Sequence, residues 1–512
     1  MSAESLVPEM TGGVVGRRSM VVVSSFVSMA AGLLSMATFE FMVVPMQKDL
    51  GFSVDTANAL ILVPSAASLL IVFAAGSLAD HLGKRRLLLW GVLVFCAGAL
   101  LVMVAPNVPV ALLGRSVGGV GGMVMGIVAL AVLNSSVTDD RERARIFGVF
   151  AALTPAIFLV APPISALLAQ SAGWRAVPVM WLLLGAASMV LTLRYTPDDS
   201  GSGESTELVT PLLAGLFLAS ATVATAVIFG ERWIAVSVIA LAIAALVGLA
   251  IRWQRLAHPG LDLRVLRPRG SWLLIGAILL SSVANLFLFT NLFLQYRYDI
   301  SLVAIALLMG VSQAAAVAGG LLGGTLIARW GAARTALTTM LLTGVTALGA
   351  TLVTVDSPEW IPVVVLSVVA IPAAASVGAL AKCLMDLAPA DGSGGASSMN
   401  NAVWSLGSAV GGIVVGLIIF GSFEAALANN LVQVAVSPET AATLASEVRE
   451  GSLFVEVMRN ADLPATARGV FNGDHSVITA AQTHAYALVG IVIFVAQLAA
   501  SGLMLAHIRR RR

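Results

Sequence analysis

The feature that most constrains this chain is a series of long apolar runs that fill most of its 512 residues. A helix that spans a membrane needs about 20 apolar residues in succession. The fourteen runs that approach or exceed this length lie at residues 20–46, 56–79, 87–105, 108–133, 144–169, 176–193, 209–229, 232–251, 272–296, 301–328, 335–355, 360–384, 398–421 and 482–507. None shows the short alternating segments of a membrane β-barrel. The sequence therefore predicts an all-α polytopic membrane protein with fourteen spans.

Composition agrees with a membrane protein and excludes other classes. Hydrophobic residues make up 58% of the chain and charged residues 11%, whereas about a quarter of the residues in soluble domains are charged. The formal net charge of +2 is too small to indicate a nucleic acid partner. We therefore expect the lipid bilayer as the main partner and no binding to nucleic acid. A monomer is expected as the working unit.

Sequence patterns typical of enzymes and metal sites are missing. The five histidines and two cysteines have no metal-ligand spacing. No phosphate-binding loop of the GxxxxGK[ST] type occurs either. We therefore expect a protein that is not an enzyme, does not use ATP, and needs neither a metal nor a cofactor.

The lysines and arginines indicate how the chain is oriented. Cytoplasmic loops of membrane proteins carry an excess of these residues. With fourteen spans both ends lie on one side, and that side holds twenty-one of them against seven on the other. The sequence therefore predicts a protein of the cell membrane with both termini in the cytoplasm.

Two connections are longer than the rest. Residues 252–271 are basic and cytoplasmic, and their leucines suit a segment that lies along the membrane surface. Residues 422–481 are external, and Ser437 before Pro438 predicts the start of a helix there. A short amphipathic hairpin and a plain solvated linker are equally open interpretations of this loop.

The loop after the second apolar run reads GSLADHLGKRR, at residues 76–86. It resembles the signature loop of the major facilitator superfamily. The matching positions include Gly76, Asp80, Gly83, Lys84 and Arg85. Glycines allow a tight turn and close helix approach, and Asp80 can pair with an arginine or a helix N-terminus. A degraded copy at residues 323–334 indicates two related halves, the usual construction of a transporter.

The number of runs and the segment HPGLDLRVLRPRG, residues 258–270, are similar to the drug:proton antiporters with fourteen spans within that superfamily. The resemblance implies two six-helix bundles and an extra helix pair. The expected parts are an N-terminus at 1–19, a first bundle at 20–193, an extra pair at 194–251, a linker at 252–271, a second bundle at 272–507 that includes the external loop, and a basic tail at 508–512.

The same resemblance implies a latch at the cytoplasmic end. In the family, an arginine before the fifth span joins the signature acid in a charge cluster that holds the inner gate. Residues 139–148, DDRERARIFG, match that region, so Asp80 with Arg143 or Arg145 would form the latch. An ordinary solvated charge run is the alternative.

The fifth run carries a weaker family feature. The antiporter group has a Gly-rich, Gly-Pro motif there, and this chain reads APPISA at residues 161–166. Pro162 matches, small residues replace the glycines, and Pro155 adds a further kink. Close packing can survive these changes, but the match to antiport over symport is weakened.

Two charges lie inside predicted spans, Glu40 in the first and Arg115 in the fourth. Counted at about 1.5 Å per residue from Met46 and Val108, both lie roughly 9–11 Å below the outer end. Arg115 matches the family's membrane-embedded arginine, whereas the related antiporters usually place their acid about one turn earlier, where Met36 stands. Intramembrane charges find partners and are commonly functional. Glu40 with Arg115 is therefore expected either to couple proton binding to transport or to form a fixed pair that joins two helices.

Further polar residues in the spans are candidates for a substrate cavity. Besides Glu40, they are Asn285, Asn291, Gln313, Asn401, Trp404 and Ser408. The last three share a helical face at spacings of three and four. Each taken alone also suits a hydrogen bond between helices.

Three functional hypotheses follow. The first is an exporter of small amphipathic drugs or metabolites, cationic or neutral, that works by alternating access and uses the proton gradient as its energy source. The second is a flippase or exporter of lipids or lipid precursors on the same fold. The third is a membrane sensor or assembly partner that transports nothing.

Overall fold

The computed structural model of the chain describes a set of residues that excludes both extreme ends and several loops. They are residues 8–52, 54–137, 139–199, 207–227, 232–255, 268, 270–282, 286–298, 302–387, 394–408, 410–411, 428–429, 432, 437–449 and 476–511. Within these residues every regular element is a helix. The predicted all-α fold is thus confirmed.

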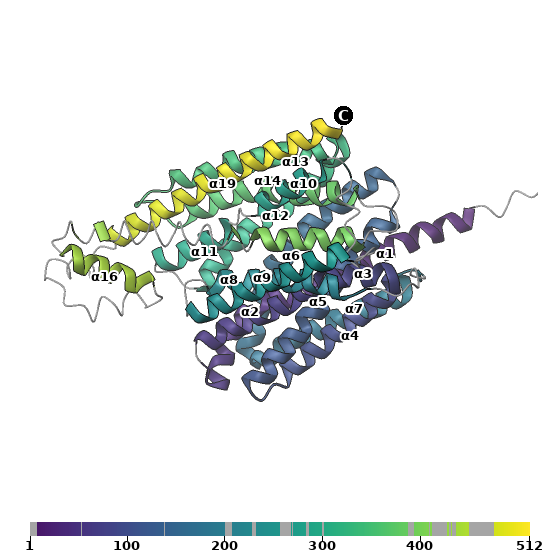
Figure 1. The fold of residues 1–512 in the computed structure, drawn as a ribbon, viewed down its shortest axis with the longest axis horizontal. Coiled ribbons are helices and arrows are strands. Elements are labelled where there is room, and N and C mark those ends of the chain that lie inside the picture. Colours follow the sequence, from purple (N-terminus) through teal and green to yellow (C-terminus); the bar gives the residue numbers. More distant parts are fainter. Residues whose placement is uncertain are drawn as a thin grey trace, which may run out of the picture.

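The first half of the chain forms one helical bundle. Its helices are α1 (Pro8–Leu50), α2 (Val54–Leu70), α3 (Val72–Leu82), α4 (Lys84–Met103), α5 (Val108–Ser136), α6 (Asp140–Ala172), the short η1 (Trp174–Ala176) and α7 (Val177–Tyr195). Helix α1 packs against α5, α6 and α7, and α4 packs against α5 and α7. Figure 1 shows these purple and blue helices on one side of the molecule.

The second half forms the other bundle. Its elements are α10 (Ser271–Ser282), α11 (Leu286–Arg297), α12 (Leu302–Trp330), α13 (Ala332–Ala347), η3 (Leu348–Leu352), α14 (Trp360–Met385), a helix over residues 394–408, α16 (Pro438–Arg449) and α19 (Ser476–Arg511). Helix α14 packs against α12 and α13, and α19 packs against α10 and α13. The green and yellow helices in Figure 1 make up this bundle. The two bundles meet where α6 packs against α12 and α14.

Helices α8 (Val209–Val227) and α9 (Arg232–Arg255) form a pair that docks on the first bundle. Helix α8 lies against α2 and α3, while α9 packs mainly on α8 and exposes a largely apolar surface. Glu207 accepts a hydrogen bond from the Thr210 backbone N–H and pairs with Arg252 Nη2 at 3.0 Å. The first turn of α8 is thereby joined to the last turn of α9.

The number of spans agrees only in part with the sequence. Among the described residues, eleven helices are long and apolar enough to cross a membrane, and two apolar helices, Val209–Ala224 and Ser271–Ser282, are shorter. Every one of the fourteen predicted runs contains helical residues. The second run is divided at Ile71, between α2 and α3. Fourteen full spans stay a prediction.

Glycines permit the closest helix contacts. A Cβ on Gly98 of α4 would lie 2.2 Å from the Gly118 nitrogen of α5. Between the bundles, a Cβ on Gly148 of α6 would lie 2.6 Å from Cα of Gly324 in α12. Small residues are what lets backbones approach in a membrane, because lipid gives apolar side chains no strong reason to associate. The glycine contact between α6 and α12 brings the bundles together near the ends of both helices that carry the charged loops.

The helix predicted after Ser437 is present as α16. The Ser437 hydroxyl accepts a hydrogen bond from the Thr440 backbone N–H at 3.1 Å, so it caps the helix N-terminus. The rest of the proposed hairpin and most of the linker over residues 252–271 lie outside the described residues.

Candidate functional site

Arg115 on α5 reaches the middle of α1. Its Nη1 donates a hydrogen bond to the Ser35 carbonyl at 3.3 Å. The guanidinium carbon lies 3.9 Å from the centre of the Phe39 ring and 5.8 Å from that of Trp181. A cation over aromatic rings is stabilised by their electron-rich faces. Arg115 therefore joins α5 to α1 and α7 inside the first bundle.

Thr38 is the centre of a buried polar cluster beside Arg115. Trp181 Nε1 donates to the Thr38 hydroxyl at 2.8 Å, and that hydroxyl donates to the Leu34 carbonyl at 2.7 Å. The Ser165 hydroxyl donates to the Thr38 carbonyl at 3.1 Å. These bonds hold one stretch of α1 against both α6 and α7.

The fifth-span motif contributes to this contact through α6. Pro155 and Pro162 are both buried inside a helix that continues from Asp140 to Ala172. Ser165, in a position where the family has a small residue, makes the bond to α1. Close approach of α6 to α1 thus survives the replacement of glycine.

Glu40 follows Phe39 on α1, but its side chain lies outside the described residues. The pairing of Glu40 with Arg115 therefore stays a prediction. Arg115 does contact Ser35 and Phe39, which lie within about one and a half turns of Glu40 at 3.6 residues per turn.

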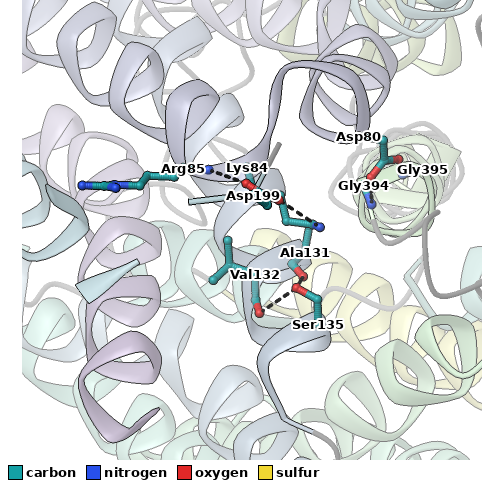
Figure 2. A network of polar contacts seen from close by, with 9 residues as sticks. All are labelled: Asp80, Lys84, Arg85, Ala131, Val132, Ser135, Asp199, Gly394 and Gly395. Carbon is teal, nitrogen blue, oxygen red and sulfur yellow. Dashed lines mark hydrogen bonds and ion pairs between the residues drawn. The ribbon is translucent and has the colours of Figure 1, made fainter. Parts of the chain in front are cut away.

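Asp80 at the end of α3 caps a helix of the other bundle. Its two carboxylate oxygens accept hydrogen bonds from the Gly394 and Gly395 backbone N–H groups at 3.2 and 3.3 Å, as Figure 2 shows. A carboxylate at a helix N-terminus is stabilised by unpaired N–H groups and by the helix dipole. A Cβ on Gly76 would lie 2.5 Å from the Gly394 carbonyl, so glycine is needed for this approach.

A charge cluster forms a second connection between the bundles. Arg143 of α6 pairs with Asp386, just after α14, at 3.1 Å, and donates to Asn134 Oδ1 at 2.7 Å. Asp386 also accepts from the buried Lys382 Nζ at 2.7 Å, and Lys382 lies 3.9 Å from Asp140. Two cations and two carboxylates from both bundles thus meet at the Asp80 end of the molecule.

The residues of the predicted latch all lie at this end of the molecule. Among the described contacts, Arg143 pairs with Asp386, and Arg145 is exposed. The first turn of α6 lies near the end of α14, whereas α3 ends at the start of the helix over residues 394–408. Two connections between the bundles are thus described, and the pairing of Asp80 with Arg143 or Arg145 stays a prediction.

The basic residues of the signature loop bind within the first half of the chain. Lys84 pairs with Asp199 at 3.4 Å (Figure 2), and Arg85 pairs with Asp198 and donates to the Leu193 carbonyl at 2.7 Å. The preceding residue, Gly83, has φ +89°, and a Cβ there would lie 2.3 Å from the Asp199 carbonyl oxygen. The loop therefore holds the segment that follows α7 and leads to α8.

The far end of the first bundle carries its own charge cluster. Asp49 accepts hydrogen bonds from Arg175 Nη1 at 2.5 Å and Trp174 Nε1 at 3.0 Å, and Arg175 also donates to the Ala105 carbonyl at 2.9 Å. These bonds lower the pKa of Asp49. They join α1, α4 and η1 only. Across the residues that the structure describes, the ion pairs between the bundles and the Asp80 contacts lie at the opposite end, and the Ser397 hydroxyl adds a bond to the Ile127 carbonyl of α5.

The predicted cavity residues have different surroundings. Asn291 and Gln313 are half-buried on α11 and α12, and Ser408 is exposed. Asn401 Nδ2 donates to the Ser397 carbonyl at 3.0 Å within its own helix, while Trp404 is half-buried. Asn285 lies outside the described residues.

Several partners in these clusters were missed from the sequence. Asp386 lies four residues after Lys382, and this i, i+4 pair of opposite charges at the end of an apolar run was an available signal. The two adjacent acids directly after the sixth run, Asp198 and Asp199, were another available signal. The backbone partners of Asp80 have no side-chain signature.

Comparison with known proteins identifies the family. A family model of the Major Facilitator Superfamily matches residues 24–412. The chain belongs to this superfamily. It is therefore a multi-pass membrane transporter and not an enzyme.

Relatives and solved structures agree with this assignment. The methylenomycin A resistance protein of Streptomyces coelicolor is 26% identical over 377 residues, which cover 70% of this chain and 76% of that protein. The puromycin resistance protein pur8 of Streptomyces alboniger is 28% identical over 75% of this chain and 78% of its own. The human organic anion transporter MFSD10 has a similar fold, with a TM-score of 0.58 at 14% identity over 94% of this chain and 99% of that one.

Proposed function

We propose that the chain exports small amphipathic molecules across the cell membrane in exchange for protons, by alternating access between its two bundles. The observation that carries this proposal is the arrangement of contacts between bundles. Asp80 with Gly394 and Gly395, and Arg143 with Asp386, lie at one end. Polar contacts that can separate together at one end are what a gate requires.

The orientation of this gate follows from the loop charges. The Asp80 end carries the excess of lysine and arginine, so we assign it to the cytoplasm together with both termini. The structure then corresponds to a state closed toward the cytoplasm. The two bundles at residues 20–193 and 272–507 would separate at this end to take up substrate, with the extra pair at residues 194–251 moving with the first bundle.

The substrate class rests on the relatives. They are named for resistance to methylenomycin A and to puromycin, and another, SmvA of Salmonella typhimurium, for resistance to methyl viologen. These molecules are small and chemically diverse. We therefore propose an exporter of several such compounds that works as a monomer.

Glu40 and Arg115 are the proposed coupling residues. A carboxyl inside the bundle has its pKa raised by burial and lowered by a nearby cation, so a proton can bind and leave near neutral pH. Arg115 is held by α1 and by two aromatic rings. Release of the proton into the cytoplasm would drive the outward step of the substrate.

Proteoliposomes test this proposal. A proton gradient is imposed, and ethidium transport and dye-induced proton release are measured for the wild type and for Glu40→Gln. We expect both signals in the wild type and neither in the variant, while the exposed control Glu439→Gln on α16 behaves like the wild type. Dye transport with unchanged proton release in Glu40→Gln would remove Glu40 from the coupling path. If the wild type moves no dye, labelled lipids are the next substrates to test.

A further inference from the structure

The helix over residues 394–408 buries polar atoms that have no hydrogen-bond partner in the described part of the chain. They are Ser398 Oγ, Asn400 Oδ1 and Trp404 Nε1. Asn400 is 3% exposed and Ser398 1%. An unpaired buried donor or acceptor costs about 1–3 kcal/mol, and such groups are few in native proteins. Packing alone gives no reason for three of them on one short helix.

Neighbouring polar groups on the same helix are paired. The Ser397 hydroxyl donates to the Ile127 carbonyl of α5 at 2.7 Å, and Asn401 Nδ2 donates to the Ser397 carbonyl at 3.0 Å. The helix is therefore able to satisfy its polar side chains where they have only a structural role. Asn400 and Trp404 differ from these neighbours.

The position of Asn400 and Trp404 is fixed by contacts on either side. Residues seven apart on a helix point in nearly the same direction, within about 20°. Trp404 thus points with Ser397 toward α5, and Asn400 points with Gly407, whose added Cβ would lie 2.6 Å from the Leu279 carbonyl of α10. The helix that carries both side chains thus contacts α5, from the first bundle, and α10, from the second.

The same helix carries the gate. Its first residues, Gly394 and Gly395, bind Asp80, and Ser398 lies against Gly76 of α3. When these contacts separate, the space between this helix and α5 opens toward the Asp80 end. Asn400 Oδ1 then offers an acceptor and Trp404 Nε1 a donor to whatever enters from that side.

We propose that Asn400 and Trp404 form a substrate contact of the state that is open to the cytoplasm, and that they recognise a group which both donates and accepts a hydrogen bond, such as a hydroxyl or an amide. This inference rests on the proposed export function. Closing the gate withdraws both atoms from the substrate and leaves them unpaired, as observed. An exporter needs this difference, because it must bind substrate more tightly in the state that loads than in the state that releases.

Two probes of different chemistry test the inference. Puromycin carries N–H and O–H groups, whereas methyl viologen is a dication with neither. Uptake of each into inside-out vesicles is measured for the wild type, Asn400→Leu and Trp404→Phe. Loss of one hydrogen bond to substrate should raise the KM for puromycin roughly tenfold and leave that for methyl viologen within about twofold. Trp233→Phe, an exposed residue of α9, is the matched control.

The outcomes separate this inference from the proposed function. Equal effects on both probes, or none on puromycin, would overturn the inference while export stands. If the wild type transports methyl viologen but not puromycin, the inference is likewise overturned while export stands. If the wild type transports neither probe, the proposed function is contradicted. The inference is then tested by whether puromycin binds near Asn400.

Binding is measured by cysteine labelling. The two native cysteines, Cys96 and Cys383, form no disulfide in the described structure and are replaced by alanine, and Asn400→Cys is introduced. A maleimide should label this position faster when Asp386→Asn weakens the gate, and puromycin should slow the labelling. A labelling rate that changes neither with Asp386→Asn nor with puromycin would overturn the inference, whether or not transport is seen. Size-exclusion chromatography of each variant verifies that it is folded.

Discussion

Arg143 and Asp386 form an ion pair across the two bundles, with Nη2 and Oδ1 3.1 Å apart. The residues are far apart in the sequence, on α6 and just after α14. Asp386 is held from its own bundle by Lys382, which is 7% exposed. If the bundles separate as proposed, Lys382 would keep the carboxylate in place and Arg143 would be the partner that leaves.

Replacing Asp386 should weaken the closed gate. Asp386→Asn removes the pair and leaves Lys382 with Asp140 at 3.9 Å. A partly exposed ion pair contributes up to about 1 kcal/mol, so the open population should rise roughly fivefold. Double electron–electron resonance between spin labels at the exposed positions Arg86 and Arg334 measures the separation of the bundles.

The matched control for the gate is the exposed Asp356→Asn, which should leave the distance distribution unchanged. Exchange of the charges in Arg143→Asp with Asp386→Arg should restore part of the closed population. An unchanged distribution in Asp386→Asn would mean that Arg143 and Asp386 do not hold the gate.

A methyl group on Gly394 should prevent full closure. Its Cβ would lie 2.5 Å from the Gly76 carbonyl and 2.9 Å from both Asp80 carboxylate oxygens. Overpacking of this kind costs roughly 1–3 kcal/mol, here only in the closed state. Gly394→Ala should therefore lower the transport rate roughly tenfold and shift the spin-label distances toward the open state.

The control for this steric effect is Gly126→Ala on α5, since nothing lies within 4 Å of its added Cβ. The melting temperature of Gly394→Ala should stay near that of the wild type because the contact lies between bundles and not inside one. Wild-type transport by Gly394→Ala would show that the gate tolerates a wider contact than this structure has.

The docking of α8 should depend on Gly215. A Cβ there would lie 1.9 Å from the Leu70 carbonyl, at the break between α2 and α3. Because the opposing atom is backbone, α8 must move, and Gly215→Ala should lower the free energy of unfolding by roughly 1–3 kcal/mol. Thermal unfolding in detergent measures this effect. Gly248→Ala on α9, whose Cβ would meet Leu213 at an ordinary 3.6 Å, should melt near the wild type, and equal melting of both variants would contradict tight docking.

The helices could be predicted from the sequence because a spanning helix is encoded locally, by the length of one apolar run. The signature loop could also be recognised locally, from Gly76 to Arg85. The break at Ile71 could not, because α8 packs at that point and no proline or glycine marks it.

The partners of the charged residues were harder to predict, since they depend on which helices meet. Asp80 binds backbone N–H groups of Gly394 and Gly395, which any two residues at a helix start would offer. Arg143 was expected to pair with Asp80, and its described partner Asp386, just after α14, was not foreseen. For Arg115, depth in the membrane predicted a pair with Glu40, which stays a prediction, whereas its contacts with Ser35, Phe39 and Trp181 were not foreseen.

The Asp49 cluster should give the first bundle a pH-dependent stability. Hydrogen bonds from Arg175 and Trp174 hold the pKa of Asp49 below its ordinary value of 3.8. A carboxyl with a lowered pKa in the folded state contributes stability above pH 3.8, and this contribution is lost as the pH falls through the lower folded value. Asp49→Asn should therefore reduce the melting temperature at pH 7, and the difference from the wild type should shrink below pH 3.8. Arg175→Gln should reproduce this profile, and the double variant should add little to either single change. A melting difference that stays constant from pH 7 to pH 3 would show that Asp49 acts through packing and not through its charge.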